Sequence, residues 1–443
     1  MDAYIDKVLL SRLFFTPLIV ILASFYLFPF EFSFAIGYNT KMLMAGFGLI
    51  VFLVRMVLNR KNNFNKQFLH VLLWGGLVSI CGLLSVLYNG TNDFAYTTYA
   101  ISMLVWISAA NVVVSVIQGV HGYISVELLC KYLIAVCVFQ CISALLIDNF
   151  TWIKTFINTY IATIASTVSS GDSLTDAGRL YGIGAALDVA GSRFSAVLIM
   201  VAACTINKNM TWQELTSFLV CFVFILVIGS AISRTTSIGV IIAIAFWIYS
   251  FIKGNVRVSK KIFWNCISSI ILLSTLVIIY LYFNNANFYN NFRFAFEGFF
   301  NWAETGNFRT NSTDVLSDMY RFPESMKTWI IGDGYFADPR LTDPYYTGIS
   351  YSAFYMGTDV GYLRFIYYFG LVGLVTFMIY FLKVTKKCMD CLPDYKMMFI
   401  FILLVNFAVW FKVSTDIFVV LAPFLCINKE DNDAYMEHIA LQS

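Results

Sequence analysis

The chain has 443 residues, of which 59% are hydrophobic and only 12% are charged. Soluble domains carry about 25% charged residues, so the composition excludes a water-soluble globular protein and predicts an all-α polytopic membrane protein. The net charge of +3 is too small to indicate a nucleic-acid-binding protein.

Apolar segments long enough to cross a bilayer recur along the chain, since a spanning helix needs about 20 mostly apolar residues. About twelve such spans are expected near 12–30, 40–58, 67–88, 97–117, 126–147, 184–206, 214–232, 235–252, 263–283, 360–382, 396–411 and 414–427. The last two are the shortest. The predicted organisation is therefore helices over 1–283 with a medium loop near 149–183, a large loop at 284–357, three helices over 358–427 and a tail at 428–443.

Three clusters of basic residues orient the predicted spans. They are Arg55, Arg60, Lys61 and Lys66; Lys253, Arg257, Lys260 and Lys261; and Lys383, Lys386, Lys387 and Lys396. Loops rich in lysine and arginine stay in the cytoplasm, and all three clusters fall on one side when both termini are cytoplasmic. The loops at 149–183 and 284–357 then lie on the outer side.

The medium loop begins with an amphipathic pattern. Apolar residues recur at Phe150, Ile153, Ile157, Ile161 and Ile164. A helix with this pattern can lie on the outer membrane surface, or it can be a partly buried helix of the loop. The pattern favours neither alternative.

The sequence indicates neither a metal site nor a histidine base. Cys388 and Cys391 form a Cys-x-x-Cys pair without a second pair or a nearby histidine, whereas a structural zinc site has four ligands. The three histidines, His70, His121 and His438, all fall on the cytoplasmic side of the predicted topology. An outer-face mechanism that requires a histidine base is therefore disfavoured.

Arginine dominates the positive charge of the outer face. The arginines at or near it are Arg179, Arg193, Arg234, Arg293, Arg309, Arg321, Arg340 and Arg364. Lysine is sparse there and is limited to Lys154, Lys327 and the marginal positions Lys41 and Lys412. A planar guanidinium binds phosphate through two hydrogen bonds, whereas a lysine is a hydrated point charge. The bias predicts a diphosphate ligand on this face.

For three of these arginines the sequence also allows a role other than diphosphate binding. Arg193 lies about two turns inside the sixth span, where a buried cation costs at least ~2.5 kcal/mol, so we expect it to face a cavity or a partner. Arg234 lies between two spans that almost no loop separates. The alternative for both is an intramembrane ion pair with Asp188 or another acid. The alternative for Arg309 is an ordinary solvated charge.

Two acids of the large loop are candidate bases. Asp333 lies between Gly332 and Gly334, where the backbone can turn tightly beside a ligand. Asp359 lies where the loop re-enters the membrane, and partial desolvation there would raise its pKa toward that of a general base. The alternative role for either acid is a turn residue or a helix cap.

Several short segments resemble those of a known family. They are Ile232–Thr236, Gly332–Phe336, the run from Thr358 to Gly373, and the patch from Arg179 to Arg193 with its Tyr181-Gly182 pair. Together with the large outer loop before the last spans, they resemble the bacterial O-antigen polymerases of the Wzy type. The resemblance implies a glycosyltransferase of the bacterial inner membrane that uses undecaprenyl-diphosphate-linked oligosaccharides, without a nucleotide sugar, metal or other cofactor.

The resemblance also implies roles for individual residues. Arg193, Arg234 and Arg309, with Arg321 behind them, would hold the diphosphate; Asp359 or Asp333 would be the base; and Tyr335 or Tyr362 would pack on sugar rings. The growing glycan would move from one lipid carrier onto a sugar hydroxyl of a new repeat unit. A chain-length regulator in the same membrane is an expected partner.

Two other functions are alternatives. An O-antigen ligase resembles this layout but carries an outer-loop histidine near the re-entry point, where this chain has Asp359. This difference favours a polymerase. A lipid-linked-oligosaccharide flippase would place polar residues in broken helices near the bilayer midplane, often within internal repeats, and no repeat is evident here. The sequence does not separate an O-antigen polymerase from a capsule or exopolysaccharide polymerase of the same type.

Overall fold

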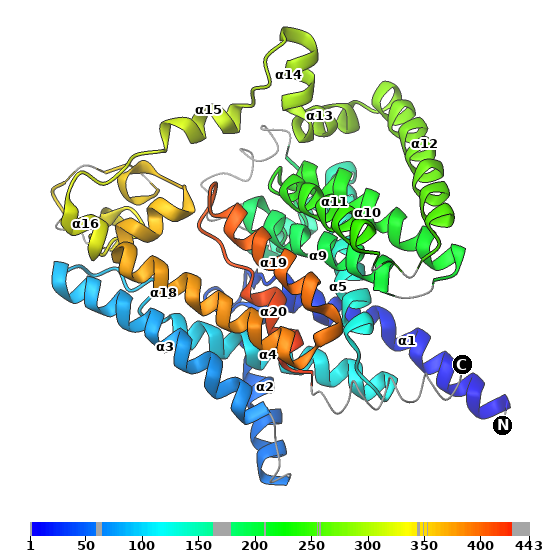
Figure 1. Cartoon of the computed structure of the whole chain (residues 1–443), viewed down its shortest axis with the longest axis horizontal. Helices are drawn as coiled ribbons and strands as arrows, with labels where there is room; N and C mark the ends of the chain where they lie inside the picture. Colours follow the sequence, from blue (N-terminus) through cyan, green and yellow to red (C-terminus); the bar gives the residue numbers. More distant parts are fainter. Residues whose placement is uncertain are drawn as a thin grey trace.

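The computed structural model describes residues 2–58, 64–162, 179–207, 210–254, 256, 258–342, 346–348, 350–351 and 353–427. Helices dominate the described chain (Figure 1), and one small sheet pairs β1 (Glu31–Phe32) antiparallel with β2 (Ile161–Ala162). Helices satisfy all their backbone hydrogen bonds internally, as a chain in lipid requires. The structure agrees with the expected all-α polytopic protein.

The helices follow the predicted apolar segments closely. The long ones are α1 (Asp2–Leu27), α2 (Thr40–Leu58), α3 (Phe64–Asn89), α4 (Tyr99–His121), α5 (Val126–Asn149), α9 (Leu187–Asn207), α10 (Trp212–Ile232), α11 (Thr236–Lys253), α12 (Lys260–Asn284) and α18 (Gly361–Cys391). The shorter ones are α6 (Thr151–Tyr160), α13 (Ala286–Ala295), α14 (Glu297–Thr305), α15 (Asn311–Asp318), α16 (Met326–Ile330), α17 (Pro339–Thr342), η1 (Tyr355–Gly357), η2 (Pro393–Tyr395), α19 (Lys396–Val409) and α20 (Phe418–Leu425).

Eight helices in the described part of the chain are long and apolar enough to cross a membrane: α3, α4, α5, α9, α10, α11, α12 and α18. The count of about twelve spans stays a prediction. α19 and α20 have 14 and 8 residues. At ~1.5 Å per residue they are about 21 and 12 Å long, against about 30 Å for the hydrocarbon core of a bilayer. Both are thus shorter than a full span.

α9 forms the centre of the bundle, since 94% of its most apolar stretch is buried. It packs against α5, α10, α11 and α19. Its closest neighbour is α11, because a side chain at Gly239 would collide with the backbone of Ser195. The Ser195 hydroxyl accepts the N–H of Gly239 at 3.2 Å and donates to the Thr235 carbonyl at 2.9 Å. Small residues permit such close approach of membrane helices.

The connection between α12 and α18 folds over one end of the bundle. Asn89 Nδ2 donates to the Gly332 carbonyl at 3.1 Å, and the Thr91 hydroxyl donates to the Gly334 carbonyl at 2.9 Å. These contacts place the connection at the end of α3. We call this the loop end of the bundle, and it also holds the starts of α4, α9, α11 and α18.

The basic clusters lie at the other end. Because α11 and α18 begin at the loop end, the lysines at their far termini and at the following helix starts lie opposite: Lys253, Lys260, Lys261, Lys383, Lys386, Lys387 and Lys396. Arg60, Lys61 and Arg257 lie outside the described residues. The described lysines share one end, as the predicted orientation requires.

The amphipathic segment forms α6 and β2. Ile157 and Ile161 are buried against Phe30, whereas the Trp152 and Phe156 side chains are 72% and 57% exposed. One face of α6 is thus packed within the protein, and the other presents aromatic rings outward. Residues 163–178, including Ile164, lie outside the described part of the chain.

Candidate functional site

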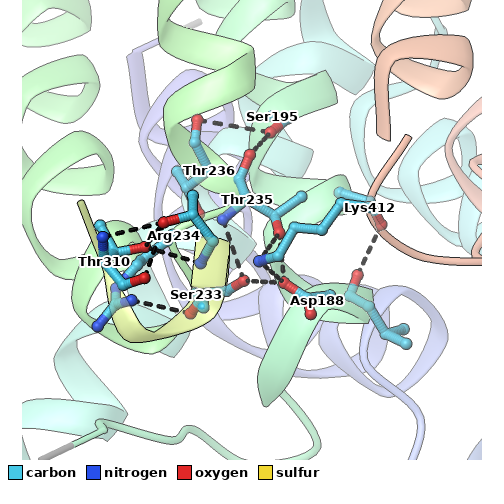
Figure 2. A network of polar contacts seen from close by, with 12 residues as sticks. Asp188, Ser195, Ser233, Arg234, Thr235, Thr236, Thr310 and Lys412 are labelled. Atoms are coloured by element: carbon cyan, nitrogen blue, oxygen red, sulfur yellow. Dashed lines mark hydrogen bonds and ion pairs between the residues drawn. The ribbon is translucent and has the colours of Figure 1, made fainter. Parts of the chain in front are cut away.

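A carboxylate at the start of α9 gathers donors from two other segments (Figure 2). The Lys412 ammonium donates to Asp188 Oδ1 at 2.7 Å and the Ser233 hydroxyl donates to it at 3.0 Å. The Thr235 hydroxyl donates to the same oxygen and accepts from Lys412 at 3.0 Å. The Asp188 and Lys412 side chains remain 23% and 25% exposed, so a polar solute can reach the pair.

The short connection between α10 and α11 places its side chains alternately. Ser233 is extended, with a φ of −153°, and Thr235 already has the helical conformation in which α11 begins. Their hydrogen bonds show that Ser233 and Thr235 face Asp188, while Arg234 faces the large loop (Figure 2). The Thr236 hydroxyl donates to the Gly229 carbonyl at 3.0 Å. The connection is thereby fixed against both flanking helices.

Arg234 ties the large loop to the bundle. Its Nε donates to the Phe294 carbonyl at 3.0 Å and its Nη1 donates to the Ser312 hydroxyl at 2.8 Å. Its Nη2 forms an ion pair with Glu297, and the guanidinium stacks over the Phe294 ring at 4.1 Å. The acid that pairs with Arg234 is thus Glu297 of the large loop, and Asp188 pairs elsewhere. All three guanidinium nitrogens bind the loop.

Asp359 lies just before α18, beside a buried arginine. Arg364 Nη1 lies 3.3 Å from Asp359 Oδ1 and donates to the Ser414 hydroxyl at 2.6 Å. Its Nη2 donates to the Phe336 carbonyl at 3.0 Å, and the guanidinium stacks on the Phe336 ring at 3.6 Å. Arg364 thus joins the helix start to the large loop and to the segment after α19.

Burial raises the pKa of Asp359 to about 6. Arg364 and Lys412 oppose this rise, and Asp188 adds to it. Asp359 therefore interacts electrostatically with the Asp188–Lys412 pair as well as with its own arginine. We call the combined group the polar cluster, which comprises Asp188, Ser233, Thr235, Asp359, Arg364, Lys412 and Ser414.

The segment between α19 and α20 supplies Lys412 and Ser414. Its ends are held by the Trp410 indole N–H, which donates to the Thr415 carbonyl at 2.6 Å, and by the Asn406 side-chain carbonyl, which accepts the Ile417 N–H at 3.2 Å. Non-helical backbone at membrane depth is tolerated where it is buried in protein or lines a polar cavity. The segment fits this description because it connects two short, largely buried helices.

Arg193 lies apart from the contacts of the polar cluster. It is only 7% exposed, and its Nη1 donates to the Leu27 carbonyl. Its guanidinium lies 5.7 Å from the rings of Phe28 and of Trp106, and Lys41 lies 4.2 Å from the same Trp106 ring. This buried cation thus contacts a backbone carbonyl and the rings of two aromatic residues. Asp188 pairs instead with Lys412.

Arg309 and Arg321 belong to the large loop. Arg309 is 70% exposed and pairs with Asp314 at 3.2 Å, which fits a solvated charge. It lies three residues before Ser312, which binds Arg234. Arg321 donates to the Met356 carbonyl at 3.3 Å and lies over the Tyr351 ring at 4.8 Å. In this structure both arginines contact loop residues.

Asp333 has the contacts of a turn residue. Its Oδ1 accepts hydrogen bonds from Lys327 at 2.7 Å and from the Thr328 hydroxyl at 2.8 Å. Its Oδ2 accepts from the Tyr355 hydroxyl at 3.3 Å, and its N–H donates to the Tyr367 carbonyl at 2.6 Å. These contacts hold α16 against α18. These contacts fit the alternative role of a turn residue, and the role of a base stays a prediction.

The two tyrosines with an expected sugar contact have different neighbours. The Tyr335 ring packs against Tyr355 at 5.4 Å, within the large loop. The Tyr362 hydroxyl donates to the Phe407 carbonyl at 3.0 Å, and its ring packs against Phe411 at 4.9 Å. Their contact with sugar stays a prediction.

The described histidines are remote from the polar cluster, and no metal-binding group is seen among the described residues. Among the described residues, no group of three or more His, Cys, Asp or Glu side chains could hold a metal ion. His70 and His121 lie toward the ends of α3 and α4 that are remote from the loop end. His438 is outside the described residues.

Comparisons with protein families, with characterised proteins and with solved structures return no match. The chemistry of the polar cluster is therefore derived from its own residues. Lys412 and Arg364 can stabilise developing negative charge, which is most effective in a water-poor site. Asp359, with a pKa of about 6, can exchange a proton near neutral pH. The arrangement suits the displacement of an anionic leaving group by a hydroxyl.

Ser414 and the pairing of Lys412 with Asp188 carry no local motif in the sequence. Lys412 and Asp188 are 224 residues apart. The sequence feature that points to these residues is the polar run around Lys412 and Asp416 between two short apolar segments. Because each segment is too short for an ordinary spanning helix, the polar connection between them is expected to be buried within the bundle.

Proposed function

We propose that this protein is a metal-independent membrane glycosyltransferase. It joins undecaprenyl-diphosphate-linked oligosaccharide repeat units into O-antigen or a related surface polysaccharide. The observation that carries the proposal is Asp359, a partly buried carboxyl with a pKa of about 6, beside the cations Arg364 and Lys412. A proton acceptor next to preorganised positive charge is what transfer from a diphosphate leaving group needs.

The proposed step is a substitution at the anomeric carbon of the donor glycan. The acceptor sugar's hydroxyl oxygen bonds to that carbon while Asp359 takes the hydroxyl proton. The bond between the anomeric carbon and the diphosphate oxygen breaks, and the diphosphate keeps the electron pair. Lys412 and Arg364 stabilise the charge that develops on it. The products are the lengthened glycan on its carrier and a free lipid diphosphate.

The arginines implied by the family resemblance take different parts in this proposal. Arg234 holds the large loop over the cluster, and Arg309, exposed and near Ser312, can turn toward a bound diphosphate. Arg193 supports the site from behind, through Leu27 at the end of α1. Arg321 stabilises the loop near η1.

The proposed location is the bacterial inner membrane, with the loop end in the periplasm and both termini in the cytoplasm. The described lysines of the predicted basic clusters lie at the end opposite the polar cluster, and positively charged segments stay cytoplasmic. In this orientation the cluster meets glycans that have already been moved outward. A chain-length regulator is the proposed partner in the same membrane.

Deletion of the gene, followed by gel analysis of the surface glycan, tests the proposal. A polymerase defect leaves a single repeat unit on the lipid core. Polymer that accumulates on the carrier lipid would indicate a ligase, and loss of all outward glycan would indicate a flippase. A ladder of unchanged length would contradict the proposal.

A further inference from the structure

An apolar groove of about 450 Å³ lies between α10 and α12 beneath α13. Branched and aromatic side chains line its walls, among them Val220, Phe224 and Val227 from α10 and Leu273, Val277 and Leu281 from α12. Its volume falls in the range of about 300–1,000 Å³ that is typical of ligand sites.

The groove exists because α12 diverges from the bundle. Only Phe263 and Cys266, near the start of α12, are buried, and Figure 1 shows the helix at the edge of the molecule, joined to α13. Leu273 and Val277 remain 64% and 48% exposed. The groove is therefore open on its side, where membrane hydrocarbon surrounds a spanning helix. Apolar cavities stay dry and take apolar ligands.

The loop end of the groove is polar. Asn291 Nδ2 donates to Asp148 Oδ2 at 3.0 Å, and both residues line the groove. Asp148 also lines a small neighbouring hollow together with the cations Lys154 and Arg179. The apolar walls thus end beside positive charge.

This positive charge continues toward the polar cluster. The Arg179 guanidinium lies 5.1 Å from the Phe294 ring, and Arg234 lies over the same ring at 4.1 Å. Arg234 is followed directly by Thr235, which binds Asp188. An anionic head group at Arg179 would therefore lie near the connection that builds the polar cluster.

We propose that this groove binds the isoprenoid chain of the polyprenyl-diphosphate-linked acceptor substrate, with the diphosphate that this substrate keeps toward Arg179 and Lys154. The charge pattern matches such a molecule, because an apolar chain fits the walls and an anionic group fits the cationic end. The identity of the chain rests on the proposed glycosyltransferase function. The groove lets the chain enter sideways from the bilayer while the head group stays at the loop end.

Lipid retention by the purified full-length protein tests the proposal. The protein is placed in phospholipid nanodiscs with undecaprenyl phosphate, and retained lipid is measured by native mass spectrometry. Dioleoyl phosphatidic acid, which carries the same monophosphate on acyl chains, is the comparison lipid. Leu273→Trp fills the groove, whereas Leu272→Trp adds the same side chain at a 65% exposed position that does not line it.

We expect Leu273→Trp to lower undecaprenyl phosphate retention about tenfold, a loss of about 1.4 kcal/mol, and Leu272→Trp to leave it unchanged. Equal retention by both variants would overturn the proposal. Equal retention of phosphatidic acid and undecaprenyl phosphate by the wild-type protein would also overturn it, because the groove would then be an ordinary phospholipid site.

A second pair of variants keeps the test valid if Leu273→Trp does not fold. Val277→Trp lies in the groove one turn beyond Leu273, and Leu276→Trp is its control outside the lining. Lipid retention is measured separately from the surface glycan of the gene deletion. Lipid retention that only the groove variants lower, together with unchanged glycan length in the deletion strain, would support the lipid site and contradict the polymerase. Single repeat units in the deletion strain, together with lipid retention that the groove variants do not lower, would support the polymerase and contradict the lipid site.

Discussion

Asp359 is the residue on which the proposed chemistry depends. Its carboxyl lies where the large loop meets α18, and burial raises its pKa to about 6, from an ordinary value of 3.8. The charged groups that act on it are Arg364, Asp188 and Lys412, from three different segments. The group is ionised at neutral pH and can still accept a proton effectively.

The activity should follow the ionisation of Asp359. Since the raised pKa is about 6, the carboxylate predominates above this pH, and the protonated form, which cannot act as a base, predominates below it. We expect kcat to fall about tenfold per pH unit below this point. A pH–rate profile of the reconstituted protein measures this, and a rate that rises toward low pH would contradict the role of a base.

Lys412 and Asp188 should act as a unit. Lys412→Ala leaves the Asp188 carboxylate without its ammonium partner 2.7 Å away, so we expect it to lower the thermal unfolding midpoint. Asp188→Asn in the same chain should recover part of that loss, because the amide no longer requires a cation.

A double-mutant cycle in detergent measures the coupling between the two residues. Contacting residues typically show coupling of about 0.5–3 kcal/mol. Lys131 and Glu127, an i,i+4 pair on α5, form a control cycle in which surface-type coupling of about 0.3–0.5 kcal/mol is expected. Strictly additive effects of the Lys412 and Asp188 changes would argue against the shared site.

The long helices follow the predicted apolar segments because hydropathy alone decides which segments enter lipid. Their ends agree less well, as α18 continues to Cys391, beyond the expected limit of 382. The short helices α13–α17 were not expected individually, since contacts from distant segments stabilise them. The hydrogen bond from Asn89 to Gly332 is one such contact.

α18 changes direction at Gly370, which has a φ of 66°. A Cβ at this position would overlap the backbone carbonyl of Ile330 at the end of α16. The Gly-rich run Phe369–Gly373 therefore has a packing role, because it lets the large loop dock closely on the helix. The Gly332 turn approaches Tyr368 in the same region.

Gly370→Ala should destabilise the protein. The Gly370 backbone, with a φ of 66° and a ψ of −173°, lies in a region essentially restricted to glycine, which costs another residue about 1–3 kcal/mol, and the overlap with Ile330 adds to this cost. Gly76→Ala in α3 is the matched control, since nothing lies within 4 Å of its added methyl group, and alanine favours a helix by about 1 kcal/mol. Thermal unfolding in detergent compares the two variants, and equal midpoints would contradict the proposed packing.

At the scale of the molecule, the polar cluster draws on four separate segments of chain. Asp359 and the Ser233–Thr235 connection were indicated by the sequence, because they stand at the boundaries of apolar spans. The sequence marks Lys412 only as a marginal outer lysine and gives no indication of Ser414. Their place depends on the short helices α19 and α20, whose packing within the bundle cannot be read from hydropathy.

The two ends of the bundle should lie on opposite sides of the membrane. Asp314→Cys places a thiol on the large loop, at a side chain that is 48% exposed, and Lys386→Cys places one near the far end of α18. A membrane-impermeant maleimide applied to intact spheroplasts should label the first variant and spare the second. The wild-type protein gives the background of the native cysteines, and the reverse pattern would contradict the proposed orientation.

The most direct test of the central claim is polymerisation by the purified protein in liposomes that contain a lipid-linked repeat unit. Product length is measured by mass spectrometry for the wild type, for Asp359→Asn and for Asp314→Asn, a control at an exposed loop acid. General-base catalysis typically contributes about 10²–10⁴-fold to the rate. We therefore expect polymer from the wild type and the control, and a loss of this size in Asp359→Asn. Full-length polymer from Asp359→Asn, or none from the wild type, would contradict the account.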